Sequence, residues 1–409
     1  MTTVNSVDTK DVATLPLKVQ RGNIARLTIA QALAGANAVV VYATGSIIGH
    51  DLAPDKSLST LAISIFVMGM AVCILPMGMV AKLYGRRMAF MLGTSCGVLT
   101  GLLAAFAVVI ASFWLFCVAT FFGGAYAAVV LSFRFAAADG VDPEKKARAL
   151  SFVMGGGVLA GVVGPQLVTH TMHLYPSHVY VATFIAQALA AALSAVVLMG
   201  IKLPKPTPEE VSGGRPLRQI IRQPLFITAI ICGAVSYMLM NFLMTAAPLA
   251  MQFDGHSQES SNLGLQWHVI AMYAPSFVTG RLIARYGAAT VVMIGLMLIG
   301  LSIVIGLMGS EVFHFWTTLI LLGVGWNFGF VGASAMVLQC HRLEENTRVQ
   351  SLNDFIVFGT MVIGSFISGG LLAAYDWDRV LWVSFVPLVL AVAILLLTFF
   401  KRSSTILIR

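Results

Sequence analysis

Two short stretches decide the fold of this chain: GMVAKLYGRR at residues 78–87 and GRLIARYGAA at residues 280–289. They lie 202 residues apart, and each places a glycine, a tyrosine and a second glycine at the same three positions. A further match, ARALS at 147–151 against TRVQS at 347–351, shares its arginine and serine at the nearly equal offset of 200 residues. Two matches at nearly one offset indicate a duplicated unit, and duplicated helical bundles with a site between the repeats are typical of transporters.

The composition excludes most classes of soluble protein. Of the 409 residues, 58% are hydrophobic and 10% are charged, whereas roughly a quarter of a soluble domain is charged. A transmembrane β-barrel would show short alternating segments in place of the long apolar runs seen here. The five cysteines are too far apart to form a CxxC pair or a zinc site. No cofactor is expected. The composition therefore predicts an all-α membrane protein with several spanning helices.

Twelve apolar stretches are long enough to cross a bilayer, since a spanning helix needs roughly 20 residues. Helices are expected because unpaired backbone groups are costly in lipid. The predicted spans are residues 26–48, 59–81, 88–110, 113–135, 149–170, 179–201, 224–251, 263–284, 289–309, 314–338, 350–374 and 379–400.

The basic residues are distributed unevenly between the two sides of the predicted membrane. Of the 25 Lys and Arg residues, 23 lie in the tails, linker and loops that would face one side, and the exceptions are Lys56 and Arg379. Because basic loops stay in the cytoplasm, both termini are expected to be cytoplasmic, in the plasma membrane (the inner membrane of a bacterium). This distribution also explains the net charge of +8 without a nucleic-acid partner.

The chain divides at its longest predicted cytoplasmic loop, KLPKPTPEEVSGGRPLRQIIRQ, whose Pro, Gly and charged residues are typical of a linker. The division predicts twelve transmembrane helices in two pseudo-symmetric bundles of six. The predicted units are a cytoplasmic tail (1–25), a six-helix bundle (26–201), a cytoplasmic linker (202–223), a second six-helix bundle (224–400) and a cytoplasmic tail (401–409).

Twelve spans in two sets of six, with a glycine and arginine motif after the second span, resemble the major facilitator superfamily. The motif residues are Gly78, Lys82, Gly85, Arg86 and Arg87, and Lys82 stands where the family carries an acidic residue. The resemblance implies a secondary transporter that works by alternating access, in which two halves rock about a site at mid-membrane. ATP is not expected, because no GxxxxGKS or GxxxxGKT phosphate loop is present. The chain is similar to bacterial permeases of this superfamily, which include riboflavin importers.

Polar side chains inside the predicted spans mark a candidate substrate site, because polar groups are costly in a bilayer. The resemblance implies that spans 1, 4, 7 and 10 surround the central cavity. The alternative for the asparagines is structural, in which their amides hydrogen-bond between helices. The candidate substrate-binding residues on these spans are Asn37, Tyr42, Tyr126, Tyr237, Asn241, Trp326 and Asn327.

The eighth span contributes two more candidates, Gln266 and His268, and is expected to bend at Pro275. His268 is interpreted either as a ligand contact or titratable coupling group, or as part of an interfacial belt beside a tryptophan. In the fifth span, small residues are expected to permit close helix contact. These are Gly155, Gly156, Gly157, Gly161 and Gly164.

Five residues near the cytoplasmic ends of the spans are candidates for gating: Lys82, Gly85, Arg86, Arg134 and Asp354. In the family, the loop after span 2 packs against span 11. We therefore expect a charge-swapped latch between Lys82 and Asp354 that closes in the outward-open state. The alternative for Asp354 is a carboxylate that stabilises a helix N-terminus. The alternative for Arg134 is a long side chain whose charged end extends to the membrane surface.

No Asp, Glu, Lys or Arg lies near the middle of any predicted span. The expected substrate is therefore a small, neutral or weakly polar organic molecule with aromatic character, and import of riboflavin or a related compound is one hypothesis. The main alternative is efflux of drugs or metabolites by proton antiport, which Gly164 and Pro165 favour through their similarity to an antiporter motif. Coupling is assigned either to protons, through His268 or a rim carboxylate, or to no ion.

A membrane-embedded enzyme is the remote alternative. It depends on His170, His173 and His178, which share one outer loop but have no acidic residue nearby. The chain is therefore not expected to be an enzyme. Its expected partners are a small-molecule substrate and the lipid bilayer, and it is expected to be a monomer.

Overall fold

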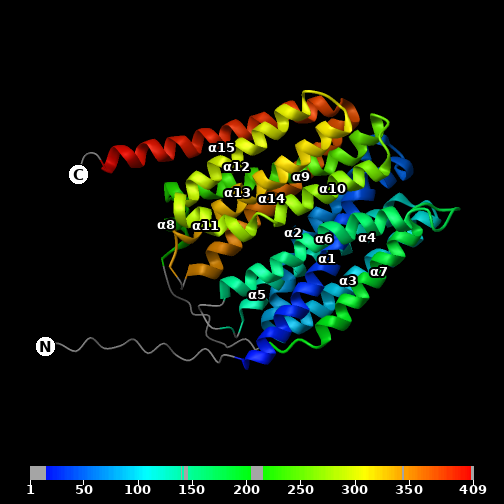
Figure 1. The fold of residues 1–409 in the computed structure, drawn as a ribbon, viewed down its shortest axis with the longest axis horizontal. Helices are drawn as coiled ribbons and strands as arrows, with labels where there is room; N and C mark the ends of the chain where they lie inside the picture. Colours follow the sequence, from blue (N-terminus) through cyan, green and yellow to red (C-terminus); the bar gives the residue numbers. More distant parts are fainter. Residues whose placement is uncertain (1–14, 140, 142–145, 204–214, 343–344, 407–409) are drawn as a thin grey trace.

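The computed structural model describes residues 15–139, 141, 146–203, 215–342 and 345–406. These described residues form helices and turns, without a strand. Figure 1 shows two helical bundles, one from each half of the chain, with the first described residue, Leu15, and the last, Ile406, at the same end of the molecule. We call this end the terminus side and the opposite end the loop side. Much of the predicted tails and linker (1–14, 204–214 and 407–409) lies outside the described residues.

The first bundle contains six long helices, and one of them continues into a short helix. A 3-10 turn, η1 (Lys56–Leu58), precedes α2. The helices are α1 (Leu17–Leu52), α2 (Leu61–Tyr84), α3 (Arg86–Val109), α4 (Phe113–Val130) with α5 (Phe133–Ala138), α6 (Lys146–Thr171) and α7 (Val181–Met199).

The second bundle repeats this arrangement after a short helix that ends the linker. Its helices are α8 (Leu217–Ile221), α9 (Pro224–Phe253), α10 (Gln258–Tyr273), α11 (Ser276–Tyr286), α12 (Ala288–Gly306), α13 (Val312–Leu338), α14 (Asn346–Ala374) and α15 (Trp377–Ile406).

Within the described part of the chain, eleven helices are long and apolar enough to cross a membrane. The predicted eighth span is not among them, because its helix is interrupted at Ala274 and Pro275. The interruption divides it into α10 and α11, of 16 and 11 residues. This break is the bend that the sequence predicts at Pro275, since proline has no N–H to donate to the helix. Placed end to end, α10 and α11 supply the remaining crossing.

The first helix begins earlier than the sequence predicts, at Leu17 in place of residue 26. Its added turns are held by Asn23, whose side-chain amide donates to the Lys202 carbonyl over 2.7 Å and whose oxygen accepts from the Lys202 N–H over 3.0 Å. These two bonds join the start of α1 to the chain just after α7. They explain how the helix extends into the segment predicted as a tail.

The repeated motif has the same backbone conformation in both halves. Gly85, between α2 and α3, has φ +89°, and Gly287, between α11 and α12, has φ +84°. A side chain is strained at such positive φ values, whereas glycine is not. The paired glycines therefore make the same sharp turn at the same place in each bundle.

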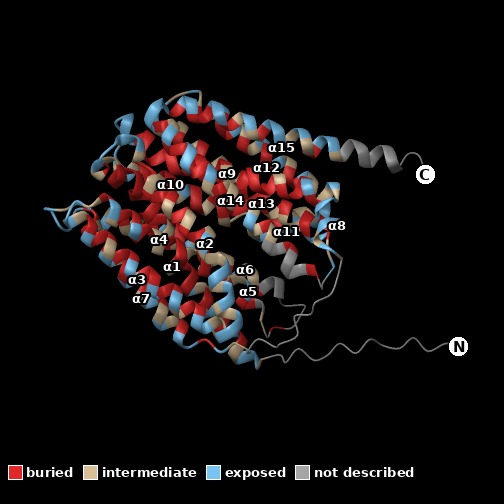
Figure 2. Ribbon diagram, turned by 180° about the vertical axis from the view of Figure 1, so that it is seen from behind, coloured by how far each residue is buried: buried red, intermediate tan, exposed pale blue. Residues whose placement is uncertain are grey.

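Large apolar side chains cover the outer surface of the molecule. Figure 2 shows exposed residues along α15 and α7, with buried residues concentrated between the bundles. In α15, Val386 is 72% exposed, and in α7, Leu189 is 66% exposed. By contrast, 78% of the residues in the most apolar 18-residue stretch of α9 are buried, against 33% in that of α15. An apolar perimeter of this kind is suited to lipid, and it leaves α9 at the centre.

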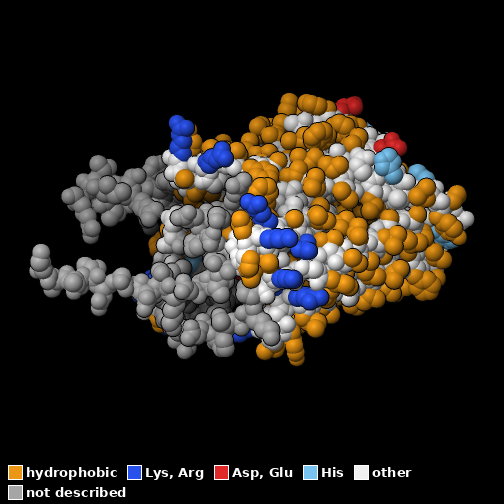
Figure 3. All heavy atoms as spheres, turned by 60° about the horizontal axis from the view of Figure 1, so that its bottom comes forward, with side chains coloured by type: hydrophobic (Ala, Val, Ile, Leu, Met, Phe, Trp, Pro, Cys, Tyr) orange, Lys and Arg blue, Asp and Glu red, His pale blue; other side chains and the backbone are white. Residues whose placement is uncertain are grey.

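Charged side chains gather at the ends of the helices. On the face drawn in Figure 3, Lys and Arg lie toward the terminus side, whereas His, Asp and Glu lie toward the loop side. The asymmetry is the one on which the predicted orientation of the chain depends.

The two bundles touch along α2 and α14 on the loop side. The hydroxyl groups of Ser64 and Ser365 are 3.0 Å apart. One turn further toward the loop side, Thr60 packs against Gly369 so closely that a Cβ atom at position 369 would lie 1.4 Å from the Thr60 hydroxyl oxygen. Only a glycine permits this approach.

A second contact between the bundles runs along α6 and α10. A Cβ atom at Gly157 would lie 2.8 Å from the Tyr273 ring, and one at Gly161 would lie 3.1 Å from Val269. Gly156 and Gly164 face α1 instead, where added Cβ atoms would meet the Thr28 carbonyl and Val39 at 2.4 and 2.6 Å. The expectation that the glycines of the fifth span permit close helix contact is therefore confirmed.

Toward the terminus side, described residues of α2 and α14 become exposed. Tyr84 near the end of α2 is 71% exposed, and Phe355 near the start of α14 is 70% exposed. Cβ atoms added at Gly78 and Gly359 would meet nothing within 4 Å. The structure is thus closed on the loop side and open between α2 and α14 on the terminus side.

Candidate functional site

One hydrogen bond joins the central helices of the two bundles. The Tyr42 hydroxyl of α1 donates to the Asn241 side-chain oxygen of α9 over 2.5 Å. Tyr42 is 6% exposed and Asn241 is fully buried. The sequence predicted both as substrate-binding residues, and the structure brings them together from positions 199 residues apart.

Aromatic rings surround Tyr237, which lies one helical turn before Asn241 on the same face of α9. The Trp326 ring meets the Tyr237 ring edge-on with centroids 5.3 Å apart, and Phe330 and Phe358 meet it at 4.9 and 5.5 Å. Trp326 and Phe330 of α13 are stacked, with centroids 5.5 Å apart and planes inclined by 14°. This aromatic group can hold a flat ring by stacking or edge contacts.

Several polar atoms of this region have no hydrogen-bond partner among the described residues. They include Asn241 Nδ2, Thr245 Oγ1 and Trp326 Nε1, all of which are buried. Buried polar atoms are nearly always paired in proteins. Their clustering on α9 and α13 points to a ligand or water that completes them.

Two opposite charges lie on the terminus side of this group. The Arg134 guanidinium, from α5 of the first bundle, and the Asp354 carboxylate, from α14 of the second, both lie within electrostatic range of the Tyr237 hydroxyl. Arg134 also lies 4.7 Å from the centroid of the Phe135 ring. Asp354 accepts a hydrogen bond of 3.1 Å from the neighbouring Asn353. The structure therefore places these two predicted gating residues next to the site, on its open side.

The other gating candidates lie farther out. Arg86 forms an ion pair of 2.6 Å with Asp139, within the first bundle. Lys82 is exposed, and it forms no ion pair with Asp354 in the described part of the chain. The predicted latch needs the terminus-side ends of α2 and α14 to be together, and in this conformation they are apart.

Two predicted substrate-binding residues point into the first bundle. Asn37 donates to the Gly123 carbonyl over 3.3 Å and accepts from Gln187, so its amide joins three helices of one half. Tyr126 packs against α3, where Gly97 leaves room for its ring. Neither residue faces the other bundle, and we leave both out of the site proposed below.

Asn327 supports the break in the eighth crossing. Its amide donates to the Met272 carbonyl and to the Ser276 hydroxyl, each over 2.7 Å, and its oxygen accepts from the Thr279 hydroxyl over 2.6 Å. The backbone carbonyl at the break needs a partner because the helix no longer supplies one. Asn327 therefore hydrogen-bonds between helices, as in the structural alternative that the sequence left open.

The two candidates on α10 also have protein partners. His268 is fully buried, and its Nδ1 lies 2.6 Å from the Leu319 carbonyl of α13. Gln266 accepts a hydrogen bond of 2.9 Å from Gln166 of α6, across the contact between the bundles. His268 is therefore enclosed in the second bundle, and Gln266 belongs to the surface where the bundles meet.

Sequence reasoning missed Phe330 and Phe358 as members of the aromatic group. Phe330 carries a signal that would have found it, since it lies four residues after Trp326 and shares its helical face. Phe358 carries none, because one phenylalanine in an apolar span looks like any other.

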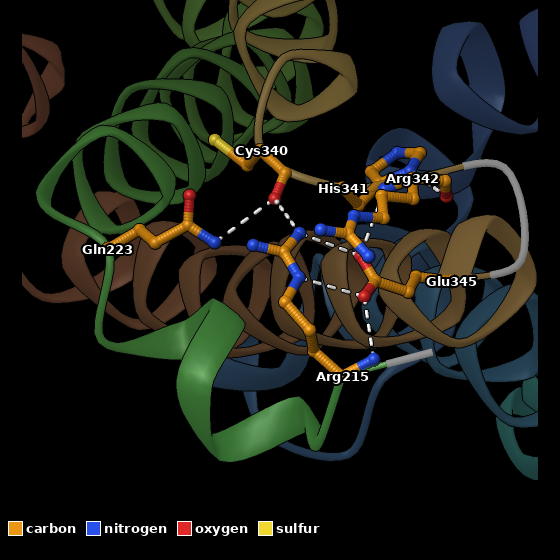
Figure 4. A network of polar contacts seen from close by, with 6 residues as sticks. All are labelled: Arg215, Gln223, Cys340, His341, Arg342 and Glu345. Carbon is orange, nitrogen blue, oxygen red and sulfur yellow. Dashed lines mark hydrogen bonds and ion pairs between the residues drawn. The ribbon is translucent and has the colours of Figure 1, made fainter. Parts of the chain in front are cut away.

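The linker is attached to the start of α14 by a compact polar network (Figure 4). The buried Glu345 carboxylate accepts from the Arg215 side chain over 2.8 and 2.9 Å, and from the Arg215 and Arg342 backbone N–H groups over 2.7 and 2.9 Å. Arg215 and Gln223 both donate to the Cys340 carbonyl. The Arg215 guanidinium, with these N–H groups, holds the pKa of Glu345 well below its usual range. The end of the linker is thereby fixed to the helix that carries Asp354.

A duplicated bundle that crosses the membrane twelve times, with polar and aromatic groups enclosed between its halves, defines a secondary membrane transporter. The chain belongs to the Major Facilitator Superfamily, whose family model matches residues 27–265 and 229–406. Membership of this superfamily places the chain among transporters.

Its relatives cover nearly the whole chain. It is 46% identical over 377 residues to the riboflavin transporter RfnT of Brucella anthropi, with 91% of this chain and 94% of that protein covered. It is 26% identical over 400 residues to YddS, an MFS-type transporter of Bacillus subtilis, with 92% and 90% covered.

Solved transporter structures share the fold at low sequence identity. A mutant of the nucleoside transporter NupG matches with a TM-score of 0.71 at 15% identity, covering 92% of this chain and 100% of that chain. A bacterial homologue of the human lysosomal transporter Spinster, in an inward-facing and unoccupied conformation, matches with a TM-score of 0.70 at 14% identity, covering 94% and 97%.

Proposed function

We propose that this transporter imports riboflavin, or a closely related flavin, across the plasma membrane. The observation that carries the proposal is the 46% identity to a riboflavin transporter over 91% of this chain. The aromatic group around Tyr237 and Trp326 supports it, because an isoalloxazine ring is flat and aromatic. The polar atoms of Asn241 suit the carbonyl and nitrogen edge of such a ring.

The proposed orientation places the terminus side in the cytoplasm, as the excess of Lys and Arg favours. In that orientation the conformation described here is open to the cytoplasm and closed to the outside. The proposed substrate-binding residues are Tyr42, Tyr237, Asn241 and Trp326, and a single chain supplies all of them, which fits a monomer.

The proposed gating and coupling groups lie on the cytoplasmic side of this site. Asp354 is the carboxylate that we propose for coupling to protons, because it faces Arg134 across the two bundles on the open side of the site. As the bundles close there, Asp354 would come to pair with the latch residue Lys82.

Complementation of a riboflavin auxotroph tests the transported substrate. A bacterial strain that cannot synthesise or import riboflavin is expected to grow at low external riboflavin when it expresses this chain. Initial-rate uptake of radiolabelled riboflavin should rise above that of the empty vector and saturate. No uptake, combined with raised tolerance to drugs, would overturn the proposal and favour efflux.

A further inference from the structure

The hydrogen bond between Tyr42 and Asn241 fixes the direction of a buried amide. A tyrosine hydroxyl that donates must pair with the amide oxygen, so the oxygen of Asn241 points toward α1. The Asn241 NH₂ group then points elsewhere, and Nδ2 has no partner among the described residues although the side chain is fully buried. An unpaired buried donor is unfavourable, and a ligand acceptor would complete it.

A second unpaired donor lies on the neighbouring helix. Trp326 is 5% exposed, and its Nε1 has no partner in the part of the chain that the structure describes. The indole N–H can only donate. Tyr237 connects the two donors, because its ring contacts Trp326 at 5.3 Å and its backbone lies one turn before Asn241.

We propose that Asn241 and Trp326 recognise the hydrogen-bond acceptor edge of a planar heteroaromatic substrate, meaning its ring carbonyls and ring nitrogens. Tyr42 acts as a positioning residue, since it turns the amide so that its N–H groups face the ligand. The inference rests on the proposed transport of a flavin and specifies which edge of the ring is read. A ring that presents only N–H groups, or a cationic amine, would set donors against donors and is excluded.

The same arrangement links recognition to the conformational cycle. Tyr42 belongs to the first bundle and Asn241 to the second, so their bond exists only while α1 and α9 are together at this level. When the bundles separate there, the amide loses its fixed orientation. The donor is therefore presented in one conformation and withdrawn in the other, as a transporter that must bind and release requires.

The test is a set of coupling cycles between protein variants and flavin analogues. The variants are Trp326→Phe, which keeps a ring but removes the N–H, and Asn241→Ala and Tyr42→Phe. The ligands are riboflavin and its 1-deaza, 5-deaza, 2-thio and 4-thio analogues, in each of which one ring acceptor is lost or weakened. Affinity is measured by isothermal titration calorimetry on purified protein, and each variant is checked for folding by thermal unfolding.

Asn241→Ala and Trp326→Phe are each expected to weaken riboflavin binding by roughly 5- to 150-fold, the usual effect of leaving a buried partner unpaired. For the analogue that lacks the paired acceptor, the same substitution should have little further effect. Tyr42→Phe should weaken riboflavin binding when Asn241 is present but not in an Asn241→Ala background.

Two other results are informative. If every variant weakens riboflavin and all four analogues by the same factor, the residues are structural and the inference is wrong, although flavin transport stands. If the unaltered protein neither binds nor transports any flavin, the proposed function fails first and the inference fails with it.

Discussion

Substitution of Gly369 by alanine should destabilise the conformation that is closed on the loop side. The added Cβ atom would lie 1.4 Å from the Thr60 hydroxyl oxygen and 2.8 Å from the Thr60 Cβ. Rotation of the threonine removes the first clash but not the second, because a Cβ atom does not move with its rotamer. Thr60 is 3% exposed, so the backbones of α2 and α14 must separate.

Overpacking of this kind costs roughly 1–3 kcal/mol. If that cost falls only on the loop-side-closed conformation, the ratio of the two conformations shifts by about 5- to 150-fold. Transport needs both conformations, so the rate of riboflavin uptake should fall, while the protein remains folded.

The shift is measurable as a distance on the terminus side. Spin labels at Lys82→Cys and Phe355→Cys, in a background without the five native cysteines, report whether the ends of α2 and α14 are apart or together. Gly369→Ala should move the distance distribution toward the shorter population. Gly370→Ala is the matched control, because a Cβ atom there would meet nothing within 4 Å.

Reversal of the effect identifies its cause. Thr60→Gly removes the Cβ atom that Gly369→Ala would strike, so the double variant should regain the long distance and the uptake rate. If Gly369→Ala and Gly370→Ala give the same distances and the same uptake, the close approach of α2 to α14 does not control the conformation, and our reasoning is refuted.

Three further predictions concern the polar contacts around the site. Glu345→Gln should lower the thermal unfolding temperature at neutral pH. Because Arg215 holds the pKa of Glu345 low, the stabilisation by its carboxylate is complete above the ordinary glutamate pKa of 4.5 and declines as the pH falls below it. The unfolding temperatures of the variant and the unaltered protein should therefore converge in acid. Asn327→Ala should cost roughly 1–3 kcal/mol of stability, since it leaves the backbone carbonyl at the helix break unpaired, and thermal unfolding should show this loss. Lys82→Asp and Asp354→Lys should each reduce riboflavin uptake, and the double exchange should restore it; without restoration there is no latch between these two positions.

The order and position of the helices were largely predictable from the sequence. The apolar runs match the observed helices closely, and the bend predicted at Pro275 is observed as an interruption between α10 and α11. The duplicated motif could also be recognised in a single sequence, because its glycines have a physical cause: the positive φ of Gly85 and Gly287 requires glycine.

The candidate site was predictable only in part. Tyr42, Tyr237, Asn241 and Trp326 do meet near the centre, whereas Asn37, at a similar depth, bonds inside its own bundle. Counting residues along a helix predicts how deep a side chain lies but not the direction in which it points. That direction depends on packing partners, such as the gap at one glycine of α3 that accepts the ring of a tyrosine from α4.

The sequence by itself determined that this protein lies in a membrane, where its helices run, that its two halves resemble each other, and that its basic residues gather at one end of the helices. The tertiary structure decided which face of each helix meets the other half, which asparagine is left with a free donor, and which side of the molecule is closed. The physical reason is that lipid and protein interior are equally apolar. A spanning helix therefore carries little sequence signal for its inward face, and only close packing between particular side chains selects it.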